Sequence, residues 1–422
     1  MASVEKHLYV NGPINTIRLE GKVGSVKKVI TLFMYWQQNP YDQTKCDDIR
    51  AVDINTYLVR QFDLAIKSKP DLTYDFMYNR RGPLVPDFNP NIRGSYENQV
   101  AEIFTKSFEI DLDENKVKKS SLVPNVRFHY LSVLDYVFRK STDILFQVQS
   151  IANNIWHNRN YNINDLAGLY DSIKIIGDEI MYVGNLFFAE KNLANPKMAK
   201  SVYSANINTK FNIPDDDVSK LVQKLIYKLR KSYENESVGK IINTCINTEF
   251  KSLLNAYIAE EKIILDTINS DIEFLKKLDG RGLYDILHPR TDGTHMYGLD
   301  TDVINEKILF YKNSSKKLGD YVYDLIGSFL DNTNLVRRFL DKKYITHDIT
   351  YINAYSGIEL IRLLVKYFGF EITNWSYLKN NDLQMCKKMI LESTHYMELN
   401  VVFLPIILNQ CTDVGSFPKS FS

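Results

Sequence analysis

Three predicted strand ends carry side chains that could do acid–base chemistry together. A nearly continuous apolar run ends at Trp36, a short strand is expected over residues 126–130, and a third strand ends near Ala354. The polar and charged side chains at or just beyond these ends are Tyr35, Gln37, Arg127, His129, Asp135 and Glu359. A carboxylate beside an arginine or a histidine can exchange protons with a bound substrate. If the three strands are neighbours in one parallel sheet, their carboxyl ends share an edge and these side chains form one pocket.

The alternative interpretation of these six residues is ordinary protein surface, because strand ends are commonly charged. Nothing in the sequence shows that the three strands are adjacent, so the surface interpretation is favoured and no catalytic residue is assigned. Established motifs are absent: there is no G-x-G-x-x-G, no G-x-x-x-x-G-K-[ST], no H-E-x-x-H and no G-x-S-x-G. We therefore expect neither a cofactor nor a bound metal.

Cysteine usage points to a reducing environment. The four cysteines are Cys46, Cys245, Cys386 and Cys411. None belongs to a C-x-x-C pair, which argues against a zinc site, and four cysteines in 422 residues make a poor disulfide framework. We expect four free thiols in a reducing compartment. A catalytic thiol is the alternative, but buried cysteines usually only pack.

The first 125 residues alternate between predicted strands and predicted helices. Strands are indicated by alternating or continuous apolar residues, and helices by apolar residues at three-to-four spacing. The expected strands are Ile14–Leu19, Val26–Trp36 and Leu72–Tyr78, and the expected helices are Ile54–Ile66, with Asp53 as its N-cap, and Tyr96–Phe108.

Helical spacing then dominates from about Leu131 to Leu340, and the α/β pattern returns near the end of the chain. There the expected elements are a strand over Ile349–Ala354, a sharp turn at Ser356–Gly357, a helix over Ile358–Phe368 with Gly369 as its C-cap, and a strand over Phe370–Trp375. The predicted fold is α+β to α/β: a discontinuous, mainly parallel sheet unit is built from both chain ends, and a large helical unit is inserted. The expected boundaries are 1–125, 126–345 and 346–422.

Composition gives no overall drive toward nucleic acid or membrane. Charged residues make up 24% of the chain, and 52 basic residues nearly cancel 51 acidic ones. Local basic helix faces such as Lys224, Lys228 and Lys231 keep nucleic-acid binding open as an alternative. The most apolar segments, Val29–Trp36 and Val401–Leu408, are too short to span a bilayer and are expected to be buried. No signal peptide is visible, and no membrane association is expected.

Several segments of the chain resemble an uncharacterised protein family of large and giant DNA viruses. The segments concerned are Asn11–Asn15, Arg18–Gly21, Lys28–Met34, Gln43–Arg50, Leu364–Phe368, Gln410–Asp413 and Phe417–Pro418. The resemblance covers most of the chain and carries no motif with assigned chemistry. It implies a viral protein of the host cytoplasm or the virion.

Relatives of that kind are expected to carry an Asp-x-His-like element at the end of the first buried strand and a Gly-x-x-His-like element at the late strand–turn corner. This arrangement resembles α/β hydrolytic folds of the erythromycin-esterase and haem-uptake type. Here Tyr35 and Gln37 occupy the first element, and Gly357 is followed by no histidine within three residues. Neither tyrosine nor glutamine replaces aspartate or histidine as a strong divalent-metal ligand. The resemblance therefore implies a degraded active site.

Three functions follow from the sequence. The favoured one is a viral accessory or structural protein without catalytic activity, which acts through contacts with viral or host proteins or as a homo-oligomer. The second is a hydrolase-like enzyme with its pocket at the strand carboxyl ends. The third is a nucleic-acid-associated protein that uses local basic helix faces.

Overall fold

The computed structural model describes residues 8–36, 42–79, 95–108, 122–131, 139–159, 161–188, 215–277 and 301–421. The chain divides into two compact units. Unit 1 comprises Met1–Ser132, Lys231–Asn243 and Ser328–Ser422, and unit 2 comprises Val133–Arg230 and Thr244–Gly327. The described residues of unit 1 include two sheets, and those of unit 2 form helices without strands. The predicted class, a mixed α+β to α/β fold with a helical region, is confirmed.

A six-stranded sheet forms the centre of unit 1, in the order β6-β5-β7-β3-β2-β8. Its strands are β2 (Pro13–Val23), β3 (Val26–Tyr35), β5 (Thr73–Asn79), β6 (Val126–Leu131), β7 (Ile345–Asn353) and β8 (Glu371–Trp375). Strands β6, β5, β7 and β3 run parallel to one another, while β2 pairs antiparallel with β3 and β8. The predicted strands ending near Trp36, Tyr130 and Ala354 therefore share one sheet and place their carboxyl ends at one edge, which is the condition that the pocket interpretation required.

A second, three-stranded sheet in the order β4-β1-β9 joins the two ends of the chain. Its strands are β1 (Tyr9–Asn11), β4 (Val52–Asp53) and β9 (Cys411–Asp413). β1 pairs parallel with β4 and antiparallel with β9. Segments of two or three residues are too short to give a period-two pattern, so the sequence did not predict this sheet.

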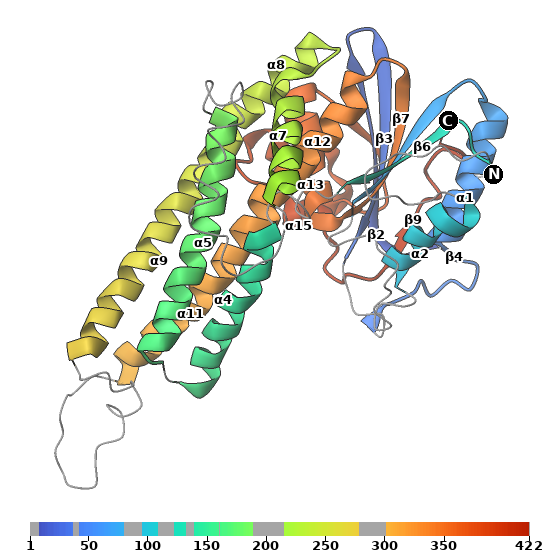
Figure 1. Ribbon diagram of the computed structural model, residues 1–422. Coiled ribbons are helices and arrows are strands. Elements are labelled where there is room, and N and C mark those ends of the chain that lie inside the picture. Colours follow the sequence, from blue (N-terminus) through green and yellow to red (C-terminus); the bar gives the residue numbers. More distant parts are fainter. Residues whose placement is uncertain are drawn as a thin grey trace. The chain divides into compact units, whose positions relative to one another are not determined.

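Helices cover both faces of the six-stranded sheet (Figure 1). On one face lie α1 (Ile54–Ser68) and α2 (Tyr96–Glu102) with the π-helical turn η3 (Ile103–Ser107), and on the other lie α12 (Ser328–Asp341) and α13 (Ala354–Phe368). The first face is aromatic: Phe62 of α1 packs edge-to-face on Phe76 of β5, 5.6 Å between ring centroids. A sheet covered on both faces needs strands without polar alternation, which is why β3 is almost continuously apolar.

The connections after β3 and β7 leave the sheet in opposite directions. β3 and β7 are adjacent and parallel, with Tyr35 opposite Asn353. The chain passes from β3 to α1, which packs with Phe33 and Tyr35, whereas β7 leads directly into α13 on the opposite face. In open α/β sheets such a switch point creates a crevice at the carboxyl ends of the two strands, where ligands bind.

Gly357 allows α13 to approach β3 closely. The structure corrects the expected turn at Ser356–Gly357: α13 already begins at Ala354, because the Asn353 side chain caps it by accepting a hydrogen bond from the Tyr355 N–H at 3.1 Å. A Cβ atom on Gly357 would lie 2.6 Å from the sulfur of Met34, a fully buried residue of β3. The glycine therefore serves helix–sheet packing and not a turn. Gly369, at φ +65°, is the left-handed C-cap that the sequence predicted.

Gly357→Ala is expected to lower the free energy of unfolding by about 1–3 kcal/mol, because the overpacking cost exceeds the gain in helix propensity. Gly168 in the helix of unit 2 that spans Ile163–Phe188 is the matched control, since a Cβ there meets only Ile151 at an ordinary 3.4 Å. Gly168→Ala should be neutral or stabilising by about 0.5–1 kcal/mol. Chemical denaturation of both variants measures the difference. Equal stability of the two would show that α13 does not pack on β3 this closely.

Unit 2 is built on long amphipathic helices. The packed elements are α4 (Arg139–Asn158), α5 (Ile163–Phe188), α9 (Lys251–Lys277) and α11 (Thr301–Gly319). The other elements of the middle region are α7 (Asp215–Lys231), α8 (Glu236–Cys245) and the π-helical segments η5 (Ile246–Phe250) and η6 (Asp320–Gly327). A buried carboxylate, Asp271, accepts a hydrogen bond from the Tyr311 hydroxyl at 2.6 Å. Across the described residues, no helix combines the length and apolar character that a bilayer crossing requires.

The two units differ from the expected boundaries at three elements. β6 belongs to unit 1 because it pairs with β5, and α12 belongs to unit 1 because it packs on α13 and β7. The segment Lys231–Asn243, which includes most of α8, also belongs to unit 1. All three had been expected within 126–345. The strand over residues 126–130 was expected, but its pairing with β5 is what assigns it to the sheet unit.

The segment Val401–Leu408 corrects a second expectation. It was predicted to be buried, but only Val402 and Phe403 are, while Val401, Ile406 and Ile407 are exposed. The segment includes the short helix α15 (Asn400–Phe403) and follows η7 (Lys379–Asn381), α14 (Leu383–Glu392) and η8 (Tyr396–Leu399). Pro405 follows the helix end, and residues 405–410 form no regular structure in which alternate residues turn inward.

The cysteines correct a third expectation. Cys46 and Cys411 form a disulfide across 365 residues of sequence, whereas Cys245 and Cys386 are free and buried. The prediction of four free thiols was therefore wrong for the first pair. Spacing alone could not reveal this disulfide, because β1 pairs with both β4 and β9 and so brings the two distant segments together.

Candidate functional site

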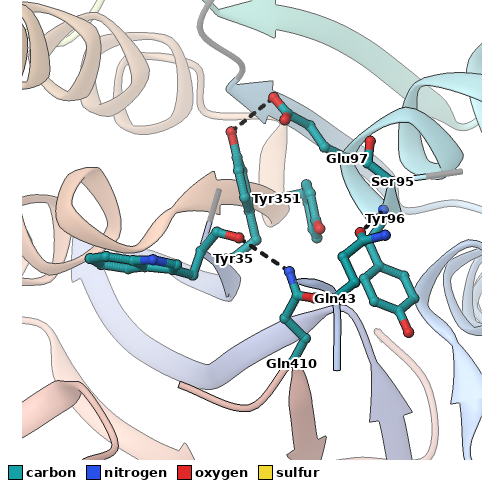
Figure 2. A pocket seen from close by; sticks show the side chains of 8 residues that line it. Tyr35, Gln43, Ser95, Tyr96, Glu97, Tyr351 and Gln410 are labelled. Carbon is teal, nitrogen blue, oxygen red and sulfur yellow. Dashed lines mark hydrogen bonds between the residues drawn. The ribbon is translucent and has the colours of Figure 1, made fainter. Parts of the chain in front are cut away.

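A small polar cavity lies at the switch point, where β3 and β7 end. Its lining residues are Tyr35, Trp36, Gln43, Ser95, Tyr96, Glu97, Tyr351 and Gln410. They come from the ends of β3 and β7, the start of α2, and the segments before β4 and β9 (Figure 2). The cavity volume open to the centre of a water molecule is about 10 Å³, which is room for about one water.

Hydrogen bonds fix one side of this cavity. The Tyr35 hydroxyl lies 3.2 Å from both the Glu97 carboxylate and the carbonyl of Asn79, and the Tyr78 hydroxyl donates to the Glu97 carbonyl at 2.9 Å. The rings of Tyr35 and Tyr351 are stacked, with centroids 4.8 Å apart. Register explains the stack, since both side chains project from the face of the sheet that α1 covers.

Two buried polar atoms of the cavity have no hydrogen-bond partner in the structure. They are the Tyr351 hydroxyl and the Gln410 Oε1, on residues that are 0% and 3% exposed. The amide nitrogen of Gln410 donates to the Trp36 carbonyl at 3.2 Å, which directs its oxygen away from Trp36. The Tyr351 hydroxyl points toward Gln43 and Gln410 (Figure 2). A group that both donates and accepts hydrogen bonds, such as water or a hydroxyl, satisfies both atoms.

Burial keeps the tyrosines of the cavity neutral. Desolvation raises the pKa of Tyr35 well above its usual value, and the neighbouring Glu97 charge raises it further. Desolvation likewise raises the pKa of Tyr351, with the nearby Tyr78 as the next cause. Neither hydroxyl is prepared to act as a phenolate base near neutral pH, because a base needs a pKa close to the working pH.

Arg127 and His129 lie on the opposite face of the sheet from this cavity. Arg127 holds Asp75 of β5 in a two-pronged ion pair, with N–O distances of 2.7 and 2.8 Å. The His129 Nε2 lies 3.2 Å from the same carboxylate, and its Nδ1 lies 3.3 Å from Arg338 of α12. Side chains alternate along β6, so Arg127 and His129 face α12 while Phe128 between them packs with the aromatic face.

The Asp75 pair belongs to a larger buried cluster of charges. Asp348 of β7 lies opposite Asp75 in register, and the two carboxylates are 1% and 0% exposed. Burial alone would raise the pKa of Asp75, but hydrogen bonds from His129 and Arg127 lower it below its usual value. Burial and the adjacent Asp75 charge raise the pKa of Asp348 well above its usual value. One carboxylate is therefore held charged, and the other is driven toward its neutral form.

Lys28 completes this cluster as a structural cation. Its ammonium group donates to the carbonyls of Phe339 at 3.0 Å and Lys342 at 2.6 Å, and also to that of Ile345. The Phe339 and Lys342 carbonyls lie at the end of α12 and directly after it, where a helix leaves acceptors without intrahelical donors, and Ile345 is the first residue of β7. Burial lowers the pKa of Lys28 to about 8, while Asp75 and Asp348 raise it. The cluster thus joins α12 to the sheet.

Glu359 is also engaged in an ion pair and does not line the cavity. It lies on α13, where Arg362 contacts it with two nitrogens at 2.7 and 2.9 Å, and both side chains are buried. Of the four sequence-proposed residues that the structure describes, Tyr35 alone lines the cavity. Arg127, His129 and Glu359 lie elsewhere in unit 1, and Gln37 and Asp135 lie outside the described residues.

A second depression lies beside the disulfide. It has a volume of about 450 Å³ and is lined by Asn11, Lys45, Cys46, Asp48, Ile49, Ala51, Val52, Asp53 and Thr56. Its charged groups are already paired in part, since Asp53 accepts from the Asn11 amide at 2.9 Å and Asp48 binds the exposed Arg50. No group of three or more His, Cys, Asp or Glu side chains is placed to hold a metal ion in the described part of the chain.

Fold and cavity together define an α/β protein with a polar cavity at a topological switch point. The chain belongs to DUF5847, a family of unknown function, which matches residues 8–422.

Its relatives include three uncharacterized proteins of Acanthamoeba polyphaga mimivirus. R706 is 30% identical over 98% of this chain and 96% of its own length, and R160 is 29% identical over 98% and 97%. R161 is 27% identical over the full length of both chains. The predicted resemblance to an uncharacterised viral family is confirmed. No solved structure matches the chain, and the likeness to erythromycin-esterase and haem-uptake folds finds no support in these comparisons.

Sequence reasoning missed most of the residues that form the cavity. Glu97 was seen only as part of a helix, and Gln43, Tyr351 and Gln410 were not singled out. Each is a common polar or aromatic residue without a motif, and the three-stranded sheet brings Gln43 and Gln410 together. The sequence feature that could have pointed to these residues was the resemblance to the viral family, because it included the segments Gln43–Arg50 and Gln410–Asp413.

Proposed function

We propose that this chain is a viral accessory or structural protein that acts by binding another protein. The observation that carries the proposal is an exposed apolar segment at 397–407, whose exposed side chains are Met397, Val401, Ile406 and Ile407. Ile406 is 97% and Ile407 is 70% exposed. Isolated exposed apolar residues are common, but several large ones close together in the chain mark interaction surfaces.

The segment is anchored and so can present these side chains in a fixed arrangement. Val402 and Phe403 are fully buried, and the Phe403 carbonyl accepts a hydrogen bond from the buried Asn15 amide at 2.8 Å. Met397 lies in the 3-10 turn η8 and Val401 in α15, which follows it directly, so regular structure holds both exposed side chains next to the buried Val402 and Phe403. A pre-positioned apolar surface loses little entropy on binding.

The geometry of the other candidate residues favours this function over the two alternatives. A hydrolase needs accessible acid–base groups, whereas Glu359 and Asp75 are buried in ion pairs with arginines. A nucleic-acid-binding face needs a concentration of cations, whereas the basic face of α7 offers Lys224 and Lys231 as exposed cations. The proposed site of action is the host cytoplasm or the virion, in keeping with the viral relatives.

Replacing both exposed isoleucines is expected to abolish partner binding without unfolding the chain. The experiment captures proteins from virus-infected cells with tagged wild type, with Ile406→Ser/Ile407→Ser and with Ile49→Ser, followed by quantitative mass spectrometry. Ile49 is the matched control, because it is 99% exposed but lies outside the segment. Exposed substitutions of this kind change stability by only about 0.5 kcal/mol.

The proposal predicts that wild type and Ile49→Ser enrich one and the same protein equally. The double variant should enrich that protein at least tenfold less. The same protein, once purified, must bind the wild-type chain directly. Equal enrichment by all three forms would contradict the proposal. A self-association that only the double variant loses would identify the partner as a second copy of this chain.

A further inference from the structure

The disulfide joins the two segments that close the polar cavity. Cys46 lies three residues after Gln43, and Cys411 directly follows Gln410. Gln43 and Gln410 both line the cavity, and neither lies in the six-stranded sheet. The wall that these two glutamines form therefore depends on how the segments before β4 and β9 are held together.

Hydrogen bonds connect the same two segments to the cavity wall. The Gln410 N–H donates to the Thr44 hydroxyl at 2.7 Å, and the Tyr96 N–H donates to the Gln43 side chain at 2.8 Å. The Cys46 N–H donates to the Asn11 side chain at 2.8 Å. The Gly12 N–H also donates to the Gln410 carbonyl at 2.9 Å, the Tyr96 hydroxyl donates to the Thr44 carbonyl at 3.3 Å, and β1 pairs with both β4 and β9. Each of these hydrogen bonds contributes only about 1 kcal/mol. A covalent link is the strongest restraint between the two segments.

The Tyr351 hydroxyl and the Gln410 Oε1 are buried in the cavity, on residues that are 0% and 3% exposed. The segments that carry Gln43 and Gln410 form one wall of that cavity, and the disulfide links these two segments. Both cysteines are half-buried, so a reductant can reach the bond.

We propose that the Cys46–Cys411 disulfide is a redox-sensitive closure of the polar cavity at the carboxyl ends of β3 and β7. A dithiol reductant transfers two electrons and two protons: the bond between the two Sγ atoms breaks, two thiols form, and the dithiol becomes a disulfide. The segments that carry Gln43 and Gln410 then separate, and water reaches the Tyr351 hydroxyl.

The closure would respond to the two proposed locations of the protein. Disulfides persist on virion surfaces and are reduced in the cytosol, so the cavity would be closed in the virion and open in the host cytoplasm. This point rests on the proposed viral role. The chemical closure itself does not, and the purified chain tests it independently of any partner.

Hydrogen exchange of the purified full-length chain, with and without a dithiol, tests the closure. Reduction is expected to accelerate exchange of the Cys46, Tyr96 and Gln410 amides at least tenfold, while amides in β3 stay unchanged. Cys46→Ser/Cys411→Ser should show the fast exchange without reductant. Cys245→Ala/Cys386→Ala, which removes the free thiols, should keep the full response of wild type.

Two outcomes would overturn the proposal. One is identical exchange of the three amides in oxidised and reduced wild type. The other is complete alkylation of Cys46 and Cys411 in chain prepared under air, which would show that the disulfide does not form. Because both measurements use wild type, neither depends on whether the cysteine variants fold.

Discussion

Asp75→Asn is expected to destabilise unit 1 by about 3–5 kcal/mol, the range found when one partner of a buried ion pair is removed. Asp75 is fully buried, and the substitution leaves Arg127 facing an uncharged amide. Asp348→Asn is the matched control, because it makes the same carboxylate-to-amide change at the residue of β7 that lies opposite Asp75. Its raised pKa already favours a neutral side chain, so the amide should cost no more than about 1 kcal/mol. Denaturant unfolding at pH 7 measures both.

The two aspartates should also give opposite dependences on pH. Folding lowers the pKa of Asp75. Its contribution to the free energy of unfolding is therefore present at a pH above the unfolded-state pKa, near 3.8, and is lost as the pH falls through the folded-state pKa. The pKa of Asp348 is raised, so its contribution is present below 3.8 and is lost as the pH rises through its folded value. Asp348→Asn should therefore gain stability relative to wild type as the pH rises. Equal losses in the two variants, or equal pH profiles, would refute this assignment of charge.

Glu359→Leu is expected to cost a similar amount, about 3–5 kcal/mol, because it removes the carboxylate that the buried Arg362 guanidinium contacts with two nitrogens. The double variant Glu359→Leu/Arg362→Met should recover most of that loss, since a buried ion pair can be exchanged for apolar side chains at little net cost. Thermal or denaturant unfolding of the two single variants and the double variant completes a double-mutant cycle.

The cycle separates a structural role from a catalytic one. If Glu359 were an acid–base group in an accessible site, its replacement by leucine would leave the free energy of unfolding unchanged or would increase it. Additive losses in Glu359→Leu and Arg362→Met would show that the two side chains are not coupled, and would reopen Glu359 as a candidate for chemistry.

Sequence patterns predicted the elements that depend on local periodicity. The continuous apolar run ending at Trp36 predicted a strand covered on both faces, and β3 is such a strand. The C-cap Gly369 followed from glycine's access to positive φ. These features are properties of neighbouring residues, which is why the sequence alone was enough.

The cavity and the ion pairs depend on contacts between distant residues, and the sequence could not supply them. Alternation along β6 places Arg127 and His129 on one face of the sheet and Phe128 on the other. Which of these faces also carries the Tyr35 side chain depends on the register of β6 with β5, β7 and β3, which the sequence does not give. Glu359 and Arg362 are three apart on a helix, a spacing equally typical of a solvated surface pair. Burial beneath the sheet makes the pair structural.

The exposed segment at 397–407 shows the same limit. Burial was predicted for Val401–Leu408 from its apolar composition, but in that stretch only Val402 and Phe403 are buried. The exposure of Ile406 and Ile407 depends on where the chain goes after Pro405, which no local pattern encodes.

A photo-cross-linking residue in place of Ile406 tests the central claim, that this segment binds a protein, most directly. The chain carrying the photoreactive residue is expressed in infected cells and irradiated, and the cross-linked products are identified by mass spectrometry. Position 49 serves as the equally exposed control. The account predicts one dominant protein product from position 406 that is absent from position 49. The same diffuse set of products from both positions would contradict it.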